Sequence, residues 1–204
     1  MKTIRLVIAL GFLTAYSTAA APQTAWSARP NIEGAVSKHV AALDANAEKQ
    51  ALRIFLNSVR KQIVTAAEAM PAVKYEFTPT EGEFKGVRTF AMEVRHLSAT
   101  NNILAGAALG EDTDDIDEKG PDNVRTKPEI LEYLNSSFDH LSKAIDAIGE
   151  PNPSVKASSI SPLPPERTTR LALIVEALIH AFDHYGQMVE YLRMNGIVPP
   201  ASRP

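Results

Sequence analysis

Two histidines near the C-terminus have the spacing of metal ligands on one face of a helix. His180 and His184 lie four residues apart in the segment 179–187. Residues at this spacing on an α-helix lie one above the other, with Cβ atoms about 5–6 Å apart, so both imidazoles can reach one ion. His96, in a separate helical stretch upstream, is the third candidate ligand. Three imidazoles around one ion would leave a position free for water or substrate.

The helical positions of these histidines indicate a site at the edge of the core. At about 100° per residue, the apolar arc of the last helix contains Leu171, Ile174, Val175, Leu178, Phe182, Tyr185, Val189 and Leu192. An acidic stripe contains Glu176, Asp183 and Glu190. His180 and His184 fall between the two, with Gln187 and Tyr191, and His96 lies at the edge of the apolar arc of its own helix. We therefore expect two adjacent helices to direct three rings into one groove.

Other polar residues near this pattern are weaker candidates for chemistry, and no catalytic residue is assigned. Gln187, Asp183 and Glu93 could orient a ligand or move a proton, although the helical angle turns Asp183 away from the groove. His140 lies opposite the apolar stripe of its helix and is expected to be exposed. His39 lies in a polar N-terminal segment without a partner at ligand spacing.

Composition excludes several functional classes. The 204 residues include no cysteine, which removes disulfides, thiolate ligands and thiol nucleophiles. The net charge of −3 offers no basic face, so nucleic acid is not an expected partner. Charged residues make up 22% and hydrophobic residues 45% of the chain, as in a soluble domain with a core.

Residues 1–21 have the pattern of a secretory signal peptide. Lys2 and Arg5 precede a short apolar run, and small residues at 19–21 offer a cleavage site. The run is shorter than the ~20 residues that a membrane span needs, although an uncleaved N-terminal anchor is the alternative. We expect an exported, periplasmic protein with no membrane attachment after cleavage. Residues 22–44 are then a tether and helix start, and residues 45–204 form the domain.

Four stretches have the three-and-four spacing of amphipathic helices. They cover about residues 33–69, 87–108, 127–148 and 166–195. The stripe of the first contains Leu52, Phe55, Val59, Ile63 and Ala66. Gly110 is expected to cap the second helix, Thr126 and Glu129 form a capping box for the third, and residues 198–200 should be extended. The pattern predicts an all-α four-helix bundle, whose long links permit crossover connections.

An acidic loop at residues 111–122 suggests calcium at first sight. An EF-hand loop needs glycine at its sixth position and glutamate at its twelfth. Counting from Asp112, those positions hold Asp117 and Asn123. A solvated run of charges is therefore the better interpretation.

Short motifs along the chain resemble the DinB-like superfamily of bacterial four-helix-bundle proteins. The matching fragments are residues 69–71, 75–79, 88–90, 94–97, 108–111, 180–187, 191–193 and 196–200, in this order. They extend over roughly residues 45–204. The resemblance implies a bundle with a crossover connection, and a divalent metal, commonly zinc or nickel, on His96, His180 and His184. It also implies frequent dimerisation, which leaves open a homodimer here.

Three functions fit this resemblance. Histidine ligands suit zinc or nickel better than magnesium or calcium, and a metal-bound water would make the protein a metal-dependent hydrolase of a small-molecule substrate. Some relatives are instead S-transferases or isomerases that activate a low-molecular-weight thiol. That chemistry needs the thiol pool of the cytosol, so the signal peptide argues against it here. The third alternative is a non-catalytic, stress-related metal-binding bundle.

Overall fold

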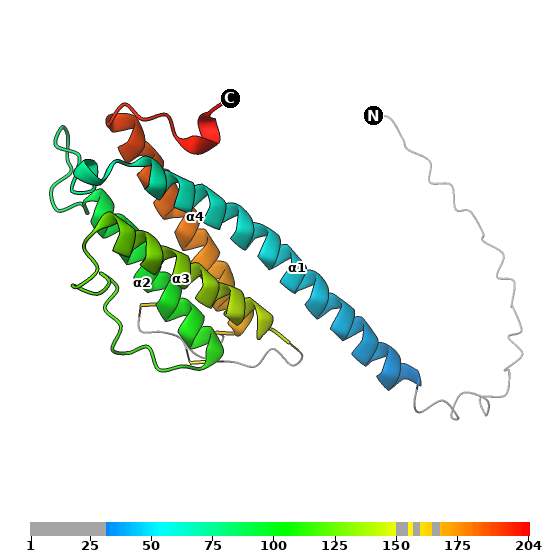
Figure 1. Ribbon diagram of the computed structural model, residues 1–204. Helices are drawn as coiled ribbons and strands as arrows, with labels where there is room; N and C mark the ends of the chain where they lie inside the picture. Colours follow the sequence, from blue (N-terminus) through cyan, green and yellow to red (C-terminus); the bar gives the residue numbers. More distant parts are fainter. Residues whose placement is uncertain (1–31, 150–154, 157–159, 165–167) are drawn as a thin grey trace, which may run out of the picture. The chain divides into compact units, whose positions relative to one another are not determined.

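The fold consists of four long helices and two short 3-10 turns (Figure 1). This computed structural model describes residues 32–149, 155–156, 160–164 and 168–204, with side chains from residue 46 onward. The helices are α1 (Ile32–Ala69), α2 (Phe90–Leu109), α3 (Lys127–Asp146) and α4 (Arg170–Met194). The turns are η2 (Ala72–Lys74) and η4 (Pro200–Ser202). The prediction of an all-α four-helix bundle is confirmed.

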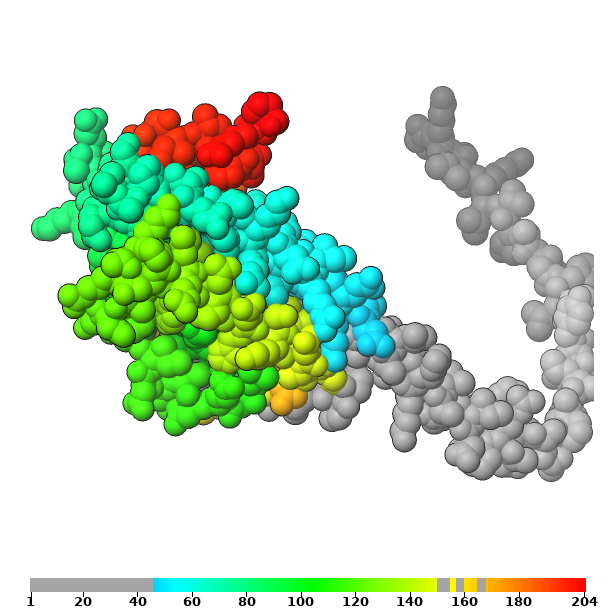
Figure 2. Space-filling view, in the orientation of Figure 1, coloured from blue at the N-terminus to red at the C-terminus, as the bar shows by residue number. Residues whose placement is uncertain are grey.

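Polar contacts between helices show how α1 and α3 are oriented. Lys127, at the start of α3, donates to the Met70 carbonyl just after α1, with Nζ and O 2.8 Å apart. Arg53, near the middle of α1, pairs with Asp146 at the end of α3. The two helices are therefore antiparallel neighbours, and their side chains meet along one face of the molecule (Figure 2).

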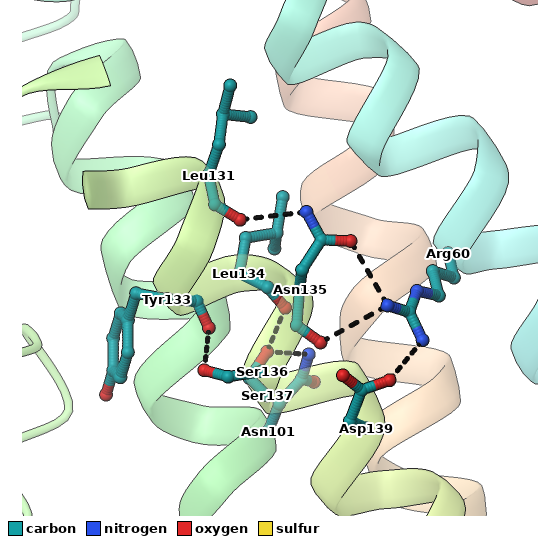
Figure 3. Close-up of polar contacts among 9 residues, drawn as sticks. All are labelled: Arg60, Asn101, Leu131, Tyr133, Leu134, Asn135, Ser136, Ser137 and Asp139. Atoms are coloured by element: carbon teal, nitrogen blue, oxygen red, sulfur yellow. Dashed lines mark hydrogen bonds and ion pairs between the residues drawn. The ribbon is translucent and has the colours of Figure 1, made fainter. Parts of the chain in front are cut away.

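The contacts of α2 require a crossover between α2 and α3. Asn101 donates to Ser137 at 3.2 Å, and His140, further along α3, contacts Asn102 (Figure 3 shows the first pair). Near the end of α2, Glu111 also lies against His140. Residues further along α2 contact residues further along α3, so the two helices are parallel. The link of residues 110–126 must therefore return along the bundle before α3 starts.

Helix α4 runs antiparallel to α2. Arg170, at the start of α4, donates to the Ala108 carbonyl at 2.8 Å, and Tyr191, near its end, donates to the Arg88 carbonyl at 2.9 Å. These two contacts, one at each end, set the register of the helix pair. They bring the middle of α4 level with the first turns of α2, where His96 lies.

The central core consists of apolar side chains from all four helices. Phe90, Leu97, Leu104, Phe138, Ile63 and Leu192 are among those with almost no exposed surface. Around this core, Arg60 of α1 contacts both Asn135 and Asp139 of α3 (Figure 3). Within the described residues, no helix has the length and apolar composition needed to cross a bilayer.

Local signals placed most helix ends correctly. Gly110 adopts a left-handed φ of 81° as the cap of α2, and the Glu129 carboxylate accepts the backbone N–H of Thr126 as the capping box predicts. The expected start of the last helix at Glu166 is wrong, because Thr168 and Thr169 are not helical. Thr169 instead caps the helix by accepting the N–H of Ala172.

Of the expectations about the chain ends, the one for the C-terminus differs in part from the structure. Residues 198–200 were expected to be extended, but Pro200 begins the turn η4, because a proline fits the first position of such a turn. The predicted signal peptide at 1–21 lies outside the described residues, as do positions 22–31. The proposed domain boundary at residue 45 stays a prediction.

The buried face of α4 is rotated from the one that its large apolar residues indicate. Val175 and Phe182, placed on the apolar arc, are each 39% exposed, whereas Ala177 and Ala181 are fully buried. Likewise Phe55 of α1 is 55% exposed. Ala177 and Ala181 of α4 face the core beside larger residues such as Ile174, and His184 is buried on the same face.

Candidate metal centre

The three candidate histidines meet at one point between α2 and α4. His96 comes from α2, and His180 and His184 come from adjacent turns of α4. The ring centroids are 4.2–5.2 Å apart, and one nitrogen from each ring lies within 4.8 Å of the others. In the described part of the chain this is the only cluster of three or more histidine or carboxylate side chains with metal-ligand spacing.

A buried carboxylate orients His184. Glu93 lies one turn before His96 on α2, and its Oε1 accepts the Nδ1–H of His184. The Glu93 side chain is 2% exposed, and the other partner close to it is Arg88, with Nη1 3.9 Å from Oε2. Because Nδ1 holds the proton for Glu93, the Nε2 lone pair of His184 faces the cluster.

A backbone carbonyl of the crossover loop orients His96. The Nδ1–H of His96 donates to the Glu118 oxygen at 2.7 Å, which directs the other ring nitrogen toward the cluster. Arg95 holds the same loop by donating to the carbonyl oxygens of Lys119 and Gly120 at 3.3–3.4 Å. The long link between α2 and α3 is therefore part of the site.

His180 completes the cluster without a second partner of its own. Its Nε2 lies 2.9 Å from Nε2 of His184, whereas its buried Nδ1 has no hydrogen-bond partner in the described structure. Burial, and then the nearby rings of His184 and His96, lower the pKa of His180 to about 3. Burial is also the main cause that lowers the pKa of His96. Both rings are thus neutral near pH 7 and have lone pairs available as ligands.

The distance between the Nε2 atoms of His180 and His184 fits a shared metal ion. Histidine nitrogens bind zinc at about 2.0–2.1 Å, so two ligands 90–110° apart are separated by about 2.9–3.4 Å. The 2.9 Å between His180 and His184 lies in this range. Two lone pairs at this distance repel each other unless a cation or a proton lies between them. A His180 ring whose Nε2 points toward a metal would also leave its Nδ1 without a partner, as the structure shows.

The other candidate residues fall outside this cluster. The Gln187 amide donates to Asp183 at 3.0 Å, and both side chains are exposed. His140 was expected to be simply exposed, but it is half-buried and lies between Asn102 and Glu111, because the end of α2 packs against this side of α3. His39 belongs to α1, and its side chain lies outside the described residues.

Two features of the site have no clear signal in the sequence. The partner of His96 is a main-chain oxygen, which any residue at position 118 would supply. Arg88, just before α2, lies close enough that its charge contributes to lowering the pKa of both His96 and His180. The spacing of Arg88, five residues before Glu93, is no signal of a site in the sequence, and only the fold places Arg88 beside the histidines.

The comparison with protein families gives the class of this bundle. The model of the DinB superfamily matches residues 56–188, well over half of the 204-residue chain. The chain belongs to the DinB superfamily. No curated protein matches it significantly.

Proposed function

We propose that the protein binds one divalent metal ion, zinc or nickel, through His96, His180 and His184, and that it is a metal-dependent hydrolase. The observation that carries the proposal is the orientation of the rings. Hydrogen bonds from Nδ1 to Glu93 and to the Glu118 carbonyl leave the Nε2 atoms of His184 and His96 free to act as ligands. DinB-like proteins commonly bind divalent metals, and this chain retains three converging imidazoles.

The donor set suits a catalytic metal. Three neutral imidazoles favour zinc or nickel over magnesium or calcium, and three protein ligands leave at least one position open. A metal held in this way acts as a Lewis acid and lowers the pKa of water. His180 is only partly buried, so the centre can be reached from solvent.

The protein's own groups have separate tasks in this proposal. Glu93 holds the proton on Nδ1 of His184 and raises the basicity of that ligand. The Glu118 carbonyl holds the proton on Nδ1 of His96 in the same way, but it is a neutral dipole and therefore a weaker acceptor than a carboxylate. Arg88 lies beside Glu93, and its positive charge contributes to keeping His96 and His180 neutral by lowering their pKa values.

The hydrolase is tested by measuring whether substrate turnover requires the bound metal. A panel of activated esters and amides should be cleaved by the metal-loaded protein, lose cleavage on chelation and regain it when zinc or nickel returns. His184→Ala should be inactive, whereas His140→Ala, a half-buried histidine outside the cluster, should be active. Equal rates for metal-free and metal-loaded protein across the panel would favour a non-catalytic metal-binding bundle. A thiol adduct formed only on the loaded protein would favour the S-transferase.

We also propose that the protein is exported to the periplasm, on the basis of the signal-like residues 1–21. N-terminal sequencing of protein from the periplasmic fraction should begin near residues 20–22. Recovery of the intact N-terminus with the membrane fraction would favour the uncleaved anchor.

A further inference from the structure

A cavity of about 670 Å³ lies between the start of α2 and the end of α4. This volume is within the range of sites for small organic molecules. Its wall includes Glu93 and Glu118, the two residues that hydrogen bond to His184 and His96. A molecule in the cavity would therefore lie next to the residues that hold two of the three histidines.

Much of the cavity wall is apolar and exposed. Phe84, Val87, Met92 and Met194 line it and are 37–51% exposed. The ring of Tyr191 contributes further apolar surface. Covering such surface is favourable by about 25 cal/mol per Å², so the wall favours a ligand with a hydrocarbon part.

Arg88 is a polar group of this wall with unused hydrogen-bonding capacity. Within the described residues, the contact of its guanidinium is the ion pair with Glu93 at 3.9 Å, too long for a hydrogen bond. Its main chain is held, because its carbonyl accepts the hydroxyl of Tyr191 at 2.9 Å. A guanidinium has five N–H donors in a planar fork that matches a carboxylate or phosphate.

The other charged groups of the cavity wall are Glu190, Glu93, Lys119 and Glu118. Glu190 is paired with Arg193 at 2.6 Å, and the Oε1 atom of Glu93 is occupied by His184. Lys119 adds a second positive charge to the wall, and Glu118 adds a negative one. In the described structure, Arg88 and Lys119 are thus the cationic groups of the wall with free donors, and of the two Arg88 has the planar fork.

We propose that this cavity binds a small amphipathic anion, with its carboxylate or phosphate on Arg88 and its hydrocarbon part against Phe84, Val87, Met92 and Met194. If the protein is the proposed hydrolase, this anion is its substrate class. The binding site itself does not depend on that function. A substrate bound in this way would present the bond to be cleaved on the side of Glu93 and the histidines. Binding itself requires no turnover.

The methionine methyl groups allow a direct binding test. Met92 and Met194 line the cavity, whereas Met70 and Met188 are buried in the core and report folding. NMR of ¹³C-methyl-methionine protein, metal-free and zinc-loaded, would be recorded with hexanoate, hexyl phosphate, hexanol and hexylamine. The two anions should shift Met92 and Met194 in both metal states, and their relative affinities distinguish a carboxylate from a phosphate site.

A variant of Arg88 assigns the binding to its guanidinium. Arg88→Gln should weaken binding of the preferred anion about tenfold or more, the usual loss for a charged hydrogen bond. The control Arg125→Gln, an exposed arginine outside the cavity wall, should bind as the wild type does. Unchanged Met70 and Met188 signals would show that both variants fold.

Equal shifts with hexanol or hexylamine, or undiminished anion binding in Arg88→Gln, would overturn this assignment. Failure of the hydrolase gives a different result. In that case the anions still shift Met92 and Met194 in an Arg88-dependent manner, while no ester is cleaved. Metal-dependent cleavage with equal rates in wild type and Arg88→Gln, for anionic and neutral esters alike, would retain the hydrolase and reject the anion site.

Discussion

The carboxylate of Glu93, on α2, accepts the Nδ1–H of His184, on α4, across the interface between the two helices. Both side chains are almost fully buried. The contact links the packing of the bundle to the orientation of a metal ligand, because the ring can present Nε2 to the cluster only while Nδ1 donates to Glu93. Glu93 is therefore a positioning residue for the centre.

Removing the charge of Glu93 should weaken metal binding while leaving the three ligands in place. Partners of this kind typically contribute 10–100-fold to metal affinity, so we expect Glu93→Gln to raise the Kd for zinc by about that factor. Competition with a chromophoric chelator measures the change. The control Glu190→Gln removes an exposed carboxylate of α4 and should bind zinc normally. Wild-type affinity in Glu93→Gln would show that the hydrogen bond has no role in the centre.

The conformation of Gly120 in the crossover loop should affect zinc binding, because this loop holds His96. The φ of Gly120 is 78°, and a Cβ there would lie 3.1 Å from the Arg95 carbonyl oxygen. Gly120→Ala combines a left-handed strain of about 1–2 kcal/mol with this close contact, and it should displace the loop that holds His96. We expect lower stability in urea unfolding and weaker zinc binding.

Gly110 provides the matched control for that variant. It has a φ of 81°, but a Cβ there would meet no atom within 4 Å. Gly110→Ala should therefore lose stability through backbone strain and keep its zinc affinity. Equal zinc affinities in the two variants would separate the loop from the metal centre.

The capping carboxylate of α3 should give a defined pH dependence of stability. Hydrogen bonds from the backbone N–H groups of Thr126 and Arg125 lower the pKa of Glu129 below its ordinary value of 4.5. A carboxyl with a lowered pKa in the folded state stabilises that state fully above the unfolded pKa, and the contribution is lost as the pH falls through the folded value. Thermal unfolding of Glu129→Ala should thus begin at a lower temperature than wild type at pH 7, with a difference that shrinks below pH 4.5.

Glu132, an exposed carboxylate on the same helix, is the control for this effect. Glu132→Ala should follow the wild-type melting temperature at every pH. A deficit in Glu129→Ala that is constant from pH 7 to pH 3 would mean that the charge of Glu129 does not contribute.

The helices could be predicted from the sequence because local rules determine them. Gly110 ends α2 through a conformation that favours glycine, and Thr126 with Glu129 begins α3 through hydrogen bonds within one turn. The start of α4 was missed because the helix begins at Arg170, four residues after the predicted start, where Thr169 caps it and the Ala108 carbonyl anchors the Arg170 side chain. Such a choice depends on tertiary contacts.

The ligand set could be proposed from spacing and resemblance, and Glu93 was among the candidates for orienting a ligand, but the rest of the surroundings could not be proposed. Large apolar side chains dominated the predicted arc of α4, whereas the structure buries Ala177 and Ala181, and with them His184. The carbonyl of Glu118 and the position of Arg88 depend on the path of loops that carry no periodic pattern. A homodimer, allowed by the resemblance, stays a prediction.

Zinc titration of the full chain tests the central claim most directly, by calorimetry on wild type, His184→Ala and His140→Ala. The account predicts one zinc ion per chain for the wild type and for His140→Ala, and no stoichiometric binding for His184→Ala. Equal zinc binding by His184→Ala and the wild type, or no binding by the wild type, would contradict a metal centre at His96, His180 and His184.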